Sequence, residues 1–221
     1  MKKSLIGIIS ITIILLSACA KDKLRGEGPI VTEYRTLLVV GGLETVKING
    51  STDVHVTYGN NYELAVKGYG NLVAALSTDV RNHVLTVEFA NHYNVRNDNT
   101  EIFLTIPHLP NIDINGSSNV DASGNFPDQA DLFFHVNGSA KINAGFINVE
   151  NLDVKINGSG NLNVTNVTAQ NAKIGISGSG KVKATVSKNL KASISGSGEI
   201  LYQGDANLET NISGSGKVTK F

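Results

Sequence analysis

Tryptophan is absent from the 221-residue sequence, cysteine occurs once and proline only four times. A single cysteine excludes an intrachain disulfide, so the fold has no covalent cross-link. Aromatic residues make up only 6%, whereas 23 glycines and an apolar content of 41% suit short β-branched strands joined by tight turns. The composition therefore predicts a folded, all-β protein.

The sequence also lacks an excess of either charge, with 19 Lys and Arg against 19 Asp and Glu. Loss of residues 1–18, argued below, removes two lysines and leaves a net charge of about −2. Such a chain offers no basic field to a phosphate backbone, and nucleic acid is therefore excluded as a partner.

No apolar run is long enough to span a bilayer. Lys2 and Lys3 precede an uncharged stretch from Leu5 to Leu16, about 12 residues where a spanning helix needs roughly 20. This pattern is typical of an export signal and favours it over a retained transmembrane anchor. We therefore assign residues 1–18 to a signal peptide.

Leu16-Ser17-Ala18-Cys19, which follows the apolar stretch, resembles the lipobox of bacterial lipoproteins, in which the cysteine is acylated and becomes the mature N-terminus. The alternative is a free thiol, but the only cysteine of the chain lies where cleavage is expected. We predict lipidation of Cys19, with residues 19–28 as a flexible tether. The predicted location is the bacterial cell envelope, on the outer membrane, either periplasmic or surface-exposed.

The C-terminal half contains a repeat of the form Ile/Val-(Asn/Ser)-Gly-Ser. The interval between its central glycines falls from 22 to 18 residues, and an isolated earlier copy lies at Gly50. Apolar residues recur two and four positions before each glycine and four positions after it, with polar residues between them, as in a half-buried strand. The central glycines are Gly116, Gly138, Gly158, Gly178, Gly196 and Gly214.

A meander of hairpins with Asn-Gly turns would also place glycine between strands. A repeat of about 20 residues with the same residue type at each step instead indicates coils stacked in register. In such a stack, equivalent residues lie ~4.8 Å apart and form columns, including one of Asn115, Asn137 and Asn157. The sequence therefore predicts a parallel β-helix with 18–22 residues per coil.

Three segments together resemble a known family: Gly28 to Arg35, Val46 to Val54, and the Ile-Ser-Gly-Ser-Gly copies that begin at Ile176, Ile194 and Ile212. The family is the head GIN domain, described as "putative autotransporter adhesin". The resemblance covers about residues 28–221 and implies a single-stranded, right-handed parallel β-helix. Residues 29–221 would form this domain, with irregular strands in 29–107 and regular Gly-Ser coils in 108–221.

Several motifs that could carry chemistry are explained by the repeat or lack partners. Gly175 to Lys181 reads as G-x-x-x-x-G-K, but Val182 stands where a nucleotide-binding loop needs Ser or Thr. The five histidines do not have the spacing of zinc ligands. Asp113, Asp121, Asp131 and Asp153 occupy different repeat positions, so no column of carboxylates is expected for glycan cleavage. We predict no catalytic, cofactor or metal site.

The leading hypothesis is a non-enzymatic, lipid-anchored envelope protein that presents a rigid β-helix as an adhesin or binding scaffold. A second hypothesis is a glycan-binding or glycan-cleaving module. A third is a structural protein that associates through the open ends of its solenoid. The expected partners are the membrane, a glycan or protein ligand, and further copies of the chain, whereas the ligand-binding residues are unknown.

Overall fold

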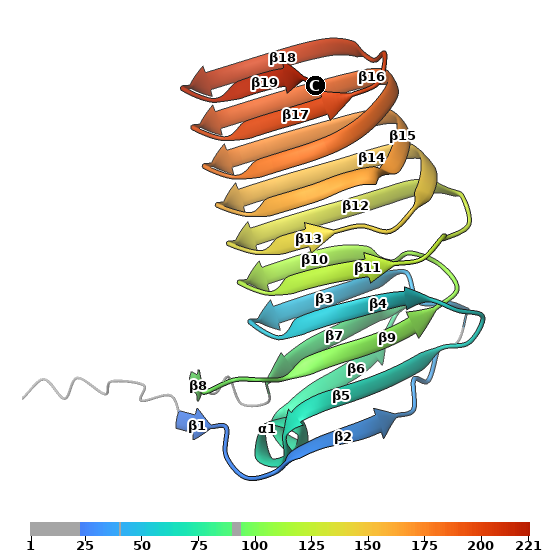
Figure 1. Cartoon of the computed structure of the whole chain (residues 1–221), viewed down its shortest axis with the longest axis vertical. Coiled ribbons are helices and arrows are strands. Elements are labelled where there is room, and N and C mark those ends of the chain that lie inside the picture. Colours follow the sequence, from blue (N-terminus) through green and yellow to red (C-terminus); the bar gives the residue numbers. More distant parts are fainter. Residues whose placement is uncertain (1–22, 40, 90–93) are drawn as a thin grey trace, which may run out of the picture.

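The computed structural model describes residues 23–39, 41–89 and 94–221, and most of them lie in β-strands. The predicted signal peptide and Cys19 lie outside the described residues. The C-terminal half forms coils that stack along one axis (Figure 1). The all-β class and the predicted parallel β-helix are confirmed.

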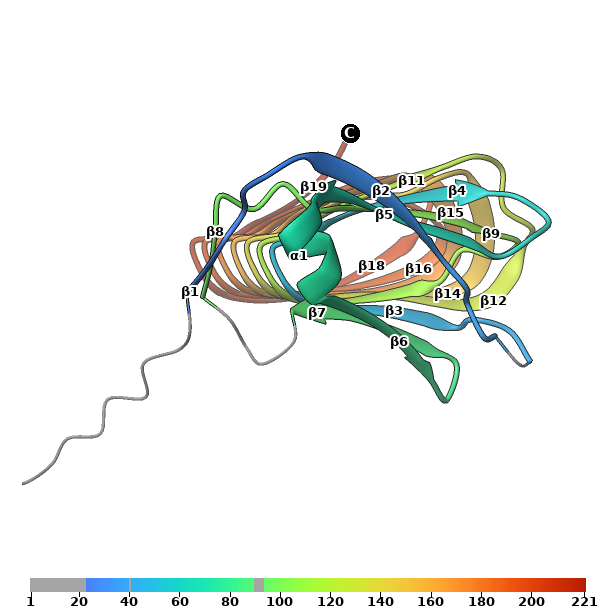
Figure 2. The same ribbon diagram turned by 90° about the horizontal axis from the view of Figure 1, so that it is seen from below.

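Each coil contributes to two sheets joined by a tight corner on one side and a wide bend on the other (Figure 2). We call them the front sheet and the back sheet. The front sheet comprises β3 (Thr45–Gly50), β10 (Asn111–Gly116), β12 (Gln129–Gly138), β14 (Ile147–Gly158), the second halves of β15 (Asn161–Gly178) and β16 (Lys181–Gly196), and β18 (Asn207–Gly214). The back sheet comprises β4 (Asp53–Tyr58), β11 (Asn119–Ser123), β13 (Lys141–Asn143), the first parts of β15 and β16, β17 (Glu199–Gln203) and β19 (Lys217–Lys220).

Neighbouring coils pair in parallel, and the central glycine of each coil lies opposite the central glycine of the next. This register excludes the hairpin meander, whose strands would pair antiparallel. The apolar positions of the repeat form columns inside the coils, such as Val154, Ile174 and Ala192, and these residues are fully buried. Polar positions between them face outward.

The corner glycines are required by the backbone and by the stacking. Gly178 has a φ of 126°, which L-residues with a side chain rarely adopt. A Cβ at Gly178 would also collide with the backbone of Gly158 in the preceding coil. The amide of Ser179 donates a hydrogen bond to the Gly158 carbonyl at 2.9 Å, so the corners stack as closely as the strands do.

Gly50 belongs to the same column and is not an isolated copy. Strand β3 pairs with β10 so that Gly50 lies opposite Gly116. On the other side of this coil, β7 (Val84–Phe89) pairs with β3, and β9 (Glu101–Ile106) pairs with β4. With β3 and β4 the chain therefore builds the second coil of the stack before it turns back to build the first, and it resumes upward at β10.

The N-terminal end of the stack is closed by a cap. Strand β5 (Glu63–Tyr69) pairs antiparallel with β9 and with β2 (Ile30–Arg35), and β6 (Leu76–Arg81) pairs antiparallel with β7. Helix α1 (Gly70–Ala75) lies next to β2, and β2 crosses this end of the stack (Figure 2). Arg35 donates hydrogen bonds to the carbonyls of Val73 at 2.6 Å and Leu76 at 2.7 Å, which fixes β2 to the helix.

Part of the expected tether is ordered. Residues Lys23–Arg25 form strand β1, which pairs in parallel with β8 (Asn94–Arg96). The backbone of β1 is held by this pairing, so residues 23–25 of the predicted tether form a strand and not a flexible linker. The last coil, by contrast, has no strand above it in the described structure, and every residue of β18 is exposed.

Candidate ligand-binding face

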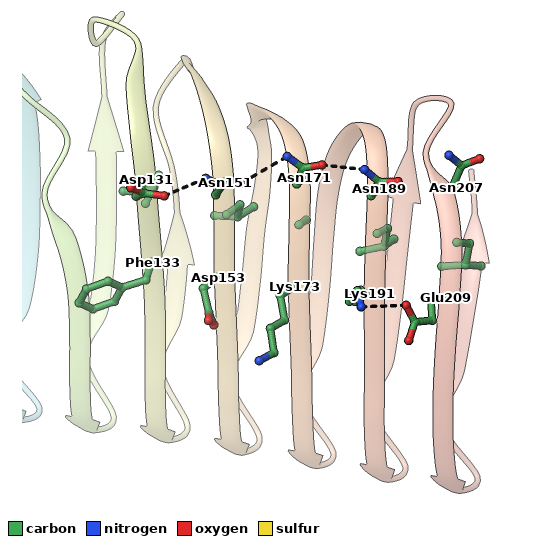
Figure 3. A pocket seen from close by; sticks show the side chains of 15 residues that line it. Asp131, Phe133, Asn151, Asp153, Asn171, Lys173, Asn189, Lys191, Asn207 and Glu209 are labelled. Carbon is green, nitrogen blue, oxygen red and sulfur yellow. Dashed lines mark hydrogen bonds and ion pairs between the residues drawn. The ribbon is translucent and has the colours of Figure 1, made fainter.

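The front sheet bears an open groove of about 670 Å³ on its outer face. Two outward rows of side chains line it and run along the stack, each across five neighbouring strands, and a row of Leu and Ala residues lies between them in sequence (Figure 3). The first row lies seven residues before the corner glycine and the second lies five residues before it. The rows are Asp131, Asn151, Asn171, Asn189 and Asn207, and Phe133, Asp153, Lys173, Lys191 and Glu209.

The first row is a ladder of amide hydrogen bonds. Asn151 donates to Asp131 at 2.9 Å, Asn171 donates to Asn151 at 3.3 Å, and Asn189 donates to Asn171 at 2.8 Å (Figure 3). An amide has two hydrogens and two lone pairs, so Asn151 and Asn189 each keep one hydrogen for a ligand. The bonds orient these amides before any ligand arrives, which lowers the entropy cost of binding.

The second row is mixed in character. Lys191 pairs with Glu209 at 3.0 Å, and the Asp153 carboxylate lies 3.4 Å from Lys155 Nζ and 3.5 Å from His135 Nε2. Phe133 stacks on His135 with ring centroids 4.5 Å apart. The groove therefore combines an apolar ring at one end with cations and carboxylates along its length.

A second, shallower hollow of about 360 Å³ lies beside the groove on the same face, nearer the corners. It arises because small residues occupy its columns, above all Gly175 between Lys155 and Ser193. Its outer edge is formed by Asn157, Ser177 and Ser195, the column predicted from the repeat. The outer face of the front sheet is thus hollowed over much of its width.

The structure separates the carboxylates considered for glycan cleavage. Asp131 and Asp153 line the same groove but in different rows, Asp113 lies in the column of His135, and Asp121 lies on the back sheet. Their distribution over different columns agrees with the repeat. The segment Gly175 to Lys181 forms the end of β15, the corner and the start of β16, so a strand follows where a phosphate-binding loop needs a helix.

The histidines are also dispersed. His135 lies on the front face, whereas His55 stacks on Phe103 at 4.9 Å and the His83 ring contacts the Gly42 carbonyl at 2.9 Å. His92 lies outside the described residues. Within the described ranges, no group of three or more His, Cys, Asp or Glu side chains is placed to hold a metal ion. No helix in the part of the chain that the structure covers is long and apolar enough to cross a membrane.

Sequence reasoning missed the groove. The asparagine column seven residues before each glycine was visible in the repeat, because Asn151, Asn171, Asn189 and Asn207 recur there. Its meaning depends on how the side chains of this column and of the next outward column leave a hollow between them. The repeat alone does not specify that side-chain arrangement.

The comparisons with known proteins agree with this architecture. Residues 42–220 match the model of the family described as "Putative auto-transporter adhesin, head GIN domain". A crystal structure of "a putative adhesin" from Bacteroides fragilis is similar with a TM-score of 0.74 and 17% identity, covering 90% of this chain and 100% of that one. A "Putative lipid binding protein" from Parabacteroides distasonis has a TM-score of 0.52, 20% identity and the same coverage. Among curated proteins, none matches the chain.

Proposed function

The chain belongs to the family described as "Putative auto-transporter adhesin, head GIN domain", and from this premise we propose that it is an adhesin-like, non-enzymatic binding protein of the cell envelope. Its ligand is an extended glycan that lies in the groove of the front sheet. Cys19 carries the lipid that anchors it.

The two rows of the groove are the observation that supports this proposal. Five strands ~4.8 Å apart give each row a length of about 19 Å, so a chain-like ligand along the stack meets an amide or carboxylate of the first row at every coil. A glycan is such a ligand, because it presents hydroxyl groups at regular intervals. Oriented amides and charged groups can both donate to and accept from those hydroxyls.

Phe133 supports the same class of ligand. A sugar ring has an apolar face of C–H groups as well as polar edges, and the Phe133 ring at one end of the groove offers a matching surface. A flat, wholly apolar ligand would leave the asparagine row without partners, which is costly. The mixture of one aromatic ring with a polar ladder therefore favours a glycan.

Binding without cleavage is proposed because hydrolysis of a glycosidic bond needs two carboxyl groups on opposite sides of that bond. Asp131 and Asp153 lie on adjacent strands, and each already contacts a neighbour, Asn151 and Lys155 respectively. The sequence Leu16 to Cys19 supports the anchor, and the signal peptide before it supports export.

A glycan array with the purified protein, lacking residues 1–19, tests the binding. The asparagine ladders offer a matched pair of variants, Asn151→Ala in the groove and Asn137→Ala in the column near the corners. Each residue donates one side-chain hydrogen bond and accepts one within its ladder, but only Asn151 lines the groove. We expect Asn151→Ala to weaken binding by roughly 1 kcal/mol, about fivefold in Kd, and Asn137→Ala to leave it unchanged.

A blank array would contradict the glycan proposal, as would equal losses from both variants. Any glycan that binds is then incubated with the protein and its products are separated by mass. Intact glycan is the expected result, whereas shortened products would show that the protein cleaves its ligand and would refute the non-enzymatic role.

A further inference from the structure

The N-terminal end of the molecule exposes large apolar side chains that the cap does not use. Ile30 is 59% exposed, Tyr34 is 83% exposed and Leu38 is 80% exposed. Ile30 and Tyr34 share one face of β2, while Arg35 on the other face bonds to α1. Leu38 follows the same strand, and its neighbours Leu37 and Val39 pack against the core. These three side chains therefore face away from the protein.

The predicted anchor is attached at this same end. Strands β1 and β2 both lie at the N-terminal end of the stack, as Figures 1 and 2 show. Three residues separate Cys19 from Lys23, the first residue of β1, and a fully extended chain over these four steps spans at most about 14 Å. A protein anchored through Cys19 therefore holds this end close to the bilayer.

We propose that the outer side of β2 and the segment after it lie against the lipid surface, with Ile30, Tyr34 and Leu38 in the boundary between headgroups and acyl chains. The proposal rests on the lipid anchor of the proposed function. Tyrosine suits this depth because its ring is apolar and its hydroxyl stays in the wet headgroup layer.

The contact is apolar and not electrostatic. Exposed groups near β2 have both signs, with Lys23 and Arg25 beside Glu27 and Glu33. Among the residues that the structure describes, this end thus has no polybasic cluster of the kind that selects anionic lipids. It follows that the contact forms equally on neutral and on anionic bilayers. With its N-terminal end on the membrane, the stack projects away from the bilayer and presents the groove along its side.

The absence of tryptophan allows a direct test, because one introduced tryptophan is the only indole of the protein. The acylated protein carrying Tyr34→Trp is reconstituted into phosphatidylcholine vesicles that contain a lipid with a nitroxide near the headgroup. Matched controls are Phe146→Trp in the middle of the stack and Phe221→Trp in the last coil, which replace side chains 59% and 57% exposed. Circular dichroism confirms that each variant is folded.

We expect the Tyr34→Trp emission to move to shorter wavelength and to lose most of its intensity to the nitroxide, with the two controls unchanged. Equal emission and equal quenching at all three positions would overturn the membrane contact. Flotation of the same vesicles separates the two proposals. Protein that floats with an unquenched Tyr34→Trp refutes the contact alone, whereas protein that does not float refutes the anchor and the contact with it.

Discussion

The inward column two residues before the corner glycines contains isoleucine both within the stack and in the last described coil. Ile176 and Ile212 both lie two residues before a corner glycine, and both point into the coil. Ile176 is covered on both sides and is 3% exposed, whereas Ile212 lies in the last described coil and is 41% exposed. Replacing each by alanine therefore compares a closed site with an open one.

The two variants are expected to lose different amounts of unfolding free energy, because only Ile176→Ala leaves an enclosed cavity. Ile→Ala removes three carbon groups at about 0.8 kcal/mol each, and a closed site adds a cavity cost, so Ile176→Ala is expected to destabilise by about 3–4 kcal/mol. The Ile212 side chain transfers only about three fifths of its surface from water and leaves no enclosed void. Ile212→Ala is therefore expected to cost roughly 1.5 kcal/mol.

Urea unfolding followed by far-ultraviolet circular dichroism measures both variants against the parent protein, since the chain has no tryptophan to report on unfolding. Amide exchange of β18 then shows whether the last coil opens before the rest. Equal losses for the two variants would refute the reasoning, because they would mean that Ile212 is as well covered as Ile176.

Three further predictions follow from other parts of the molecule. Gly178→Ala should lower the free energy of unfolding by at least ~2 kcal/mol because its Cβ would collide with the backbone of Gly158. Gly175→Ala in the same coil should change the free energy of unfolding by no more than about 0.5 kcal/mol. If Gly178→Ala unfolds in urea like the parent protein, the corner geometry is contradicted. Arg35→Ala should lower the melting temperature by removing the charged hydrogen bonds that Arg35 donates to the Val73 and Leu76 carbonyls, at a cost of roughly 2–3 kcal/mol. The exposed Arg81→Ala should leave the melting temperature unchanged, and a reversed order would refute the role of Arg35. Cells grown with a labelled fatty acid should label the protein but not its Cys19→Ala variant, and label retained by the variant would exclude lipidation at this residue.

The coils were predictable because their sequence repeats. The alternation of apolar and polar residues on both sides of the corner predicts where the strands lie. The constant residue type at each repeat position predicts that equivalent residues of neighbouring coils pair in parallel. The structure adds the reason for the glycine at each corner, since a stacked corner leaves no room for a Cβ.

The N-terminal part was not predictable in the same way. Gly50 looked isolated because 66 residues separate it from its spatial neighbour Gly116, and those residues build the first coil and the cap. Each strand there occurs once, so no repeat reveals its partner. The groove was missed for a related reason, because it depends on how the side chains of five neighbouring strands lie relative to one another.

Lysine acetylation measured by mass spectrometry tests most directly whether the groove is the ligand face. Lys173 and Lys191 line the groove, and Lys141 and Lys217 on the back sheet serve as controls within the same molecule. With a saturating glycan from the array, we predict slower acetylation of Lys173 and Lys191 and unchanged acetylation of Lys141 and Lys217. Protection of the back-sheet lysines, or of none of the four while the glycan is bound, would contradict the account.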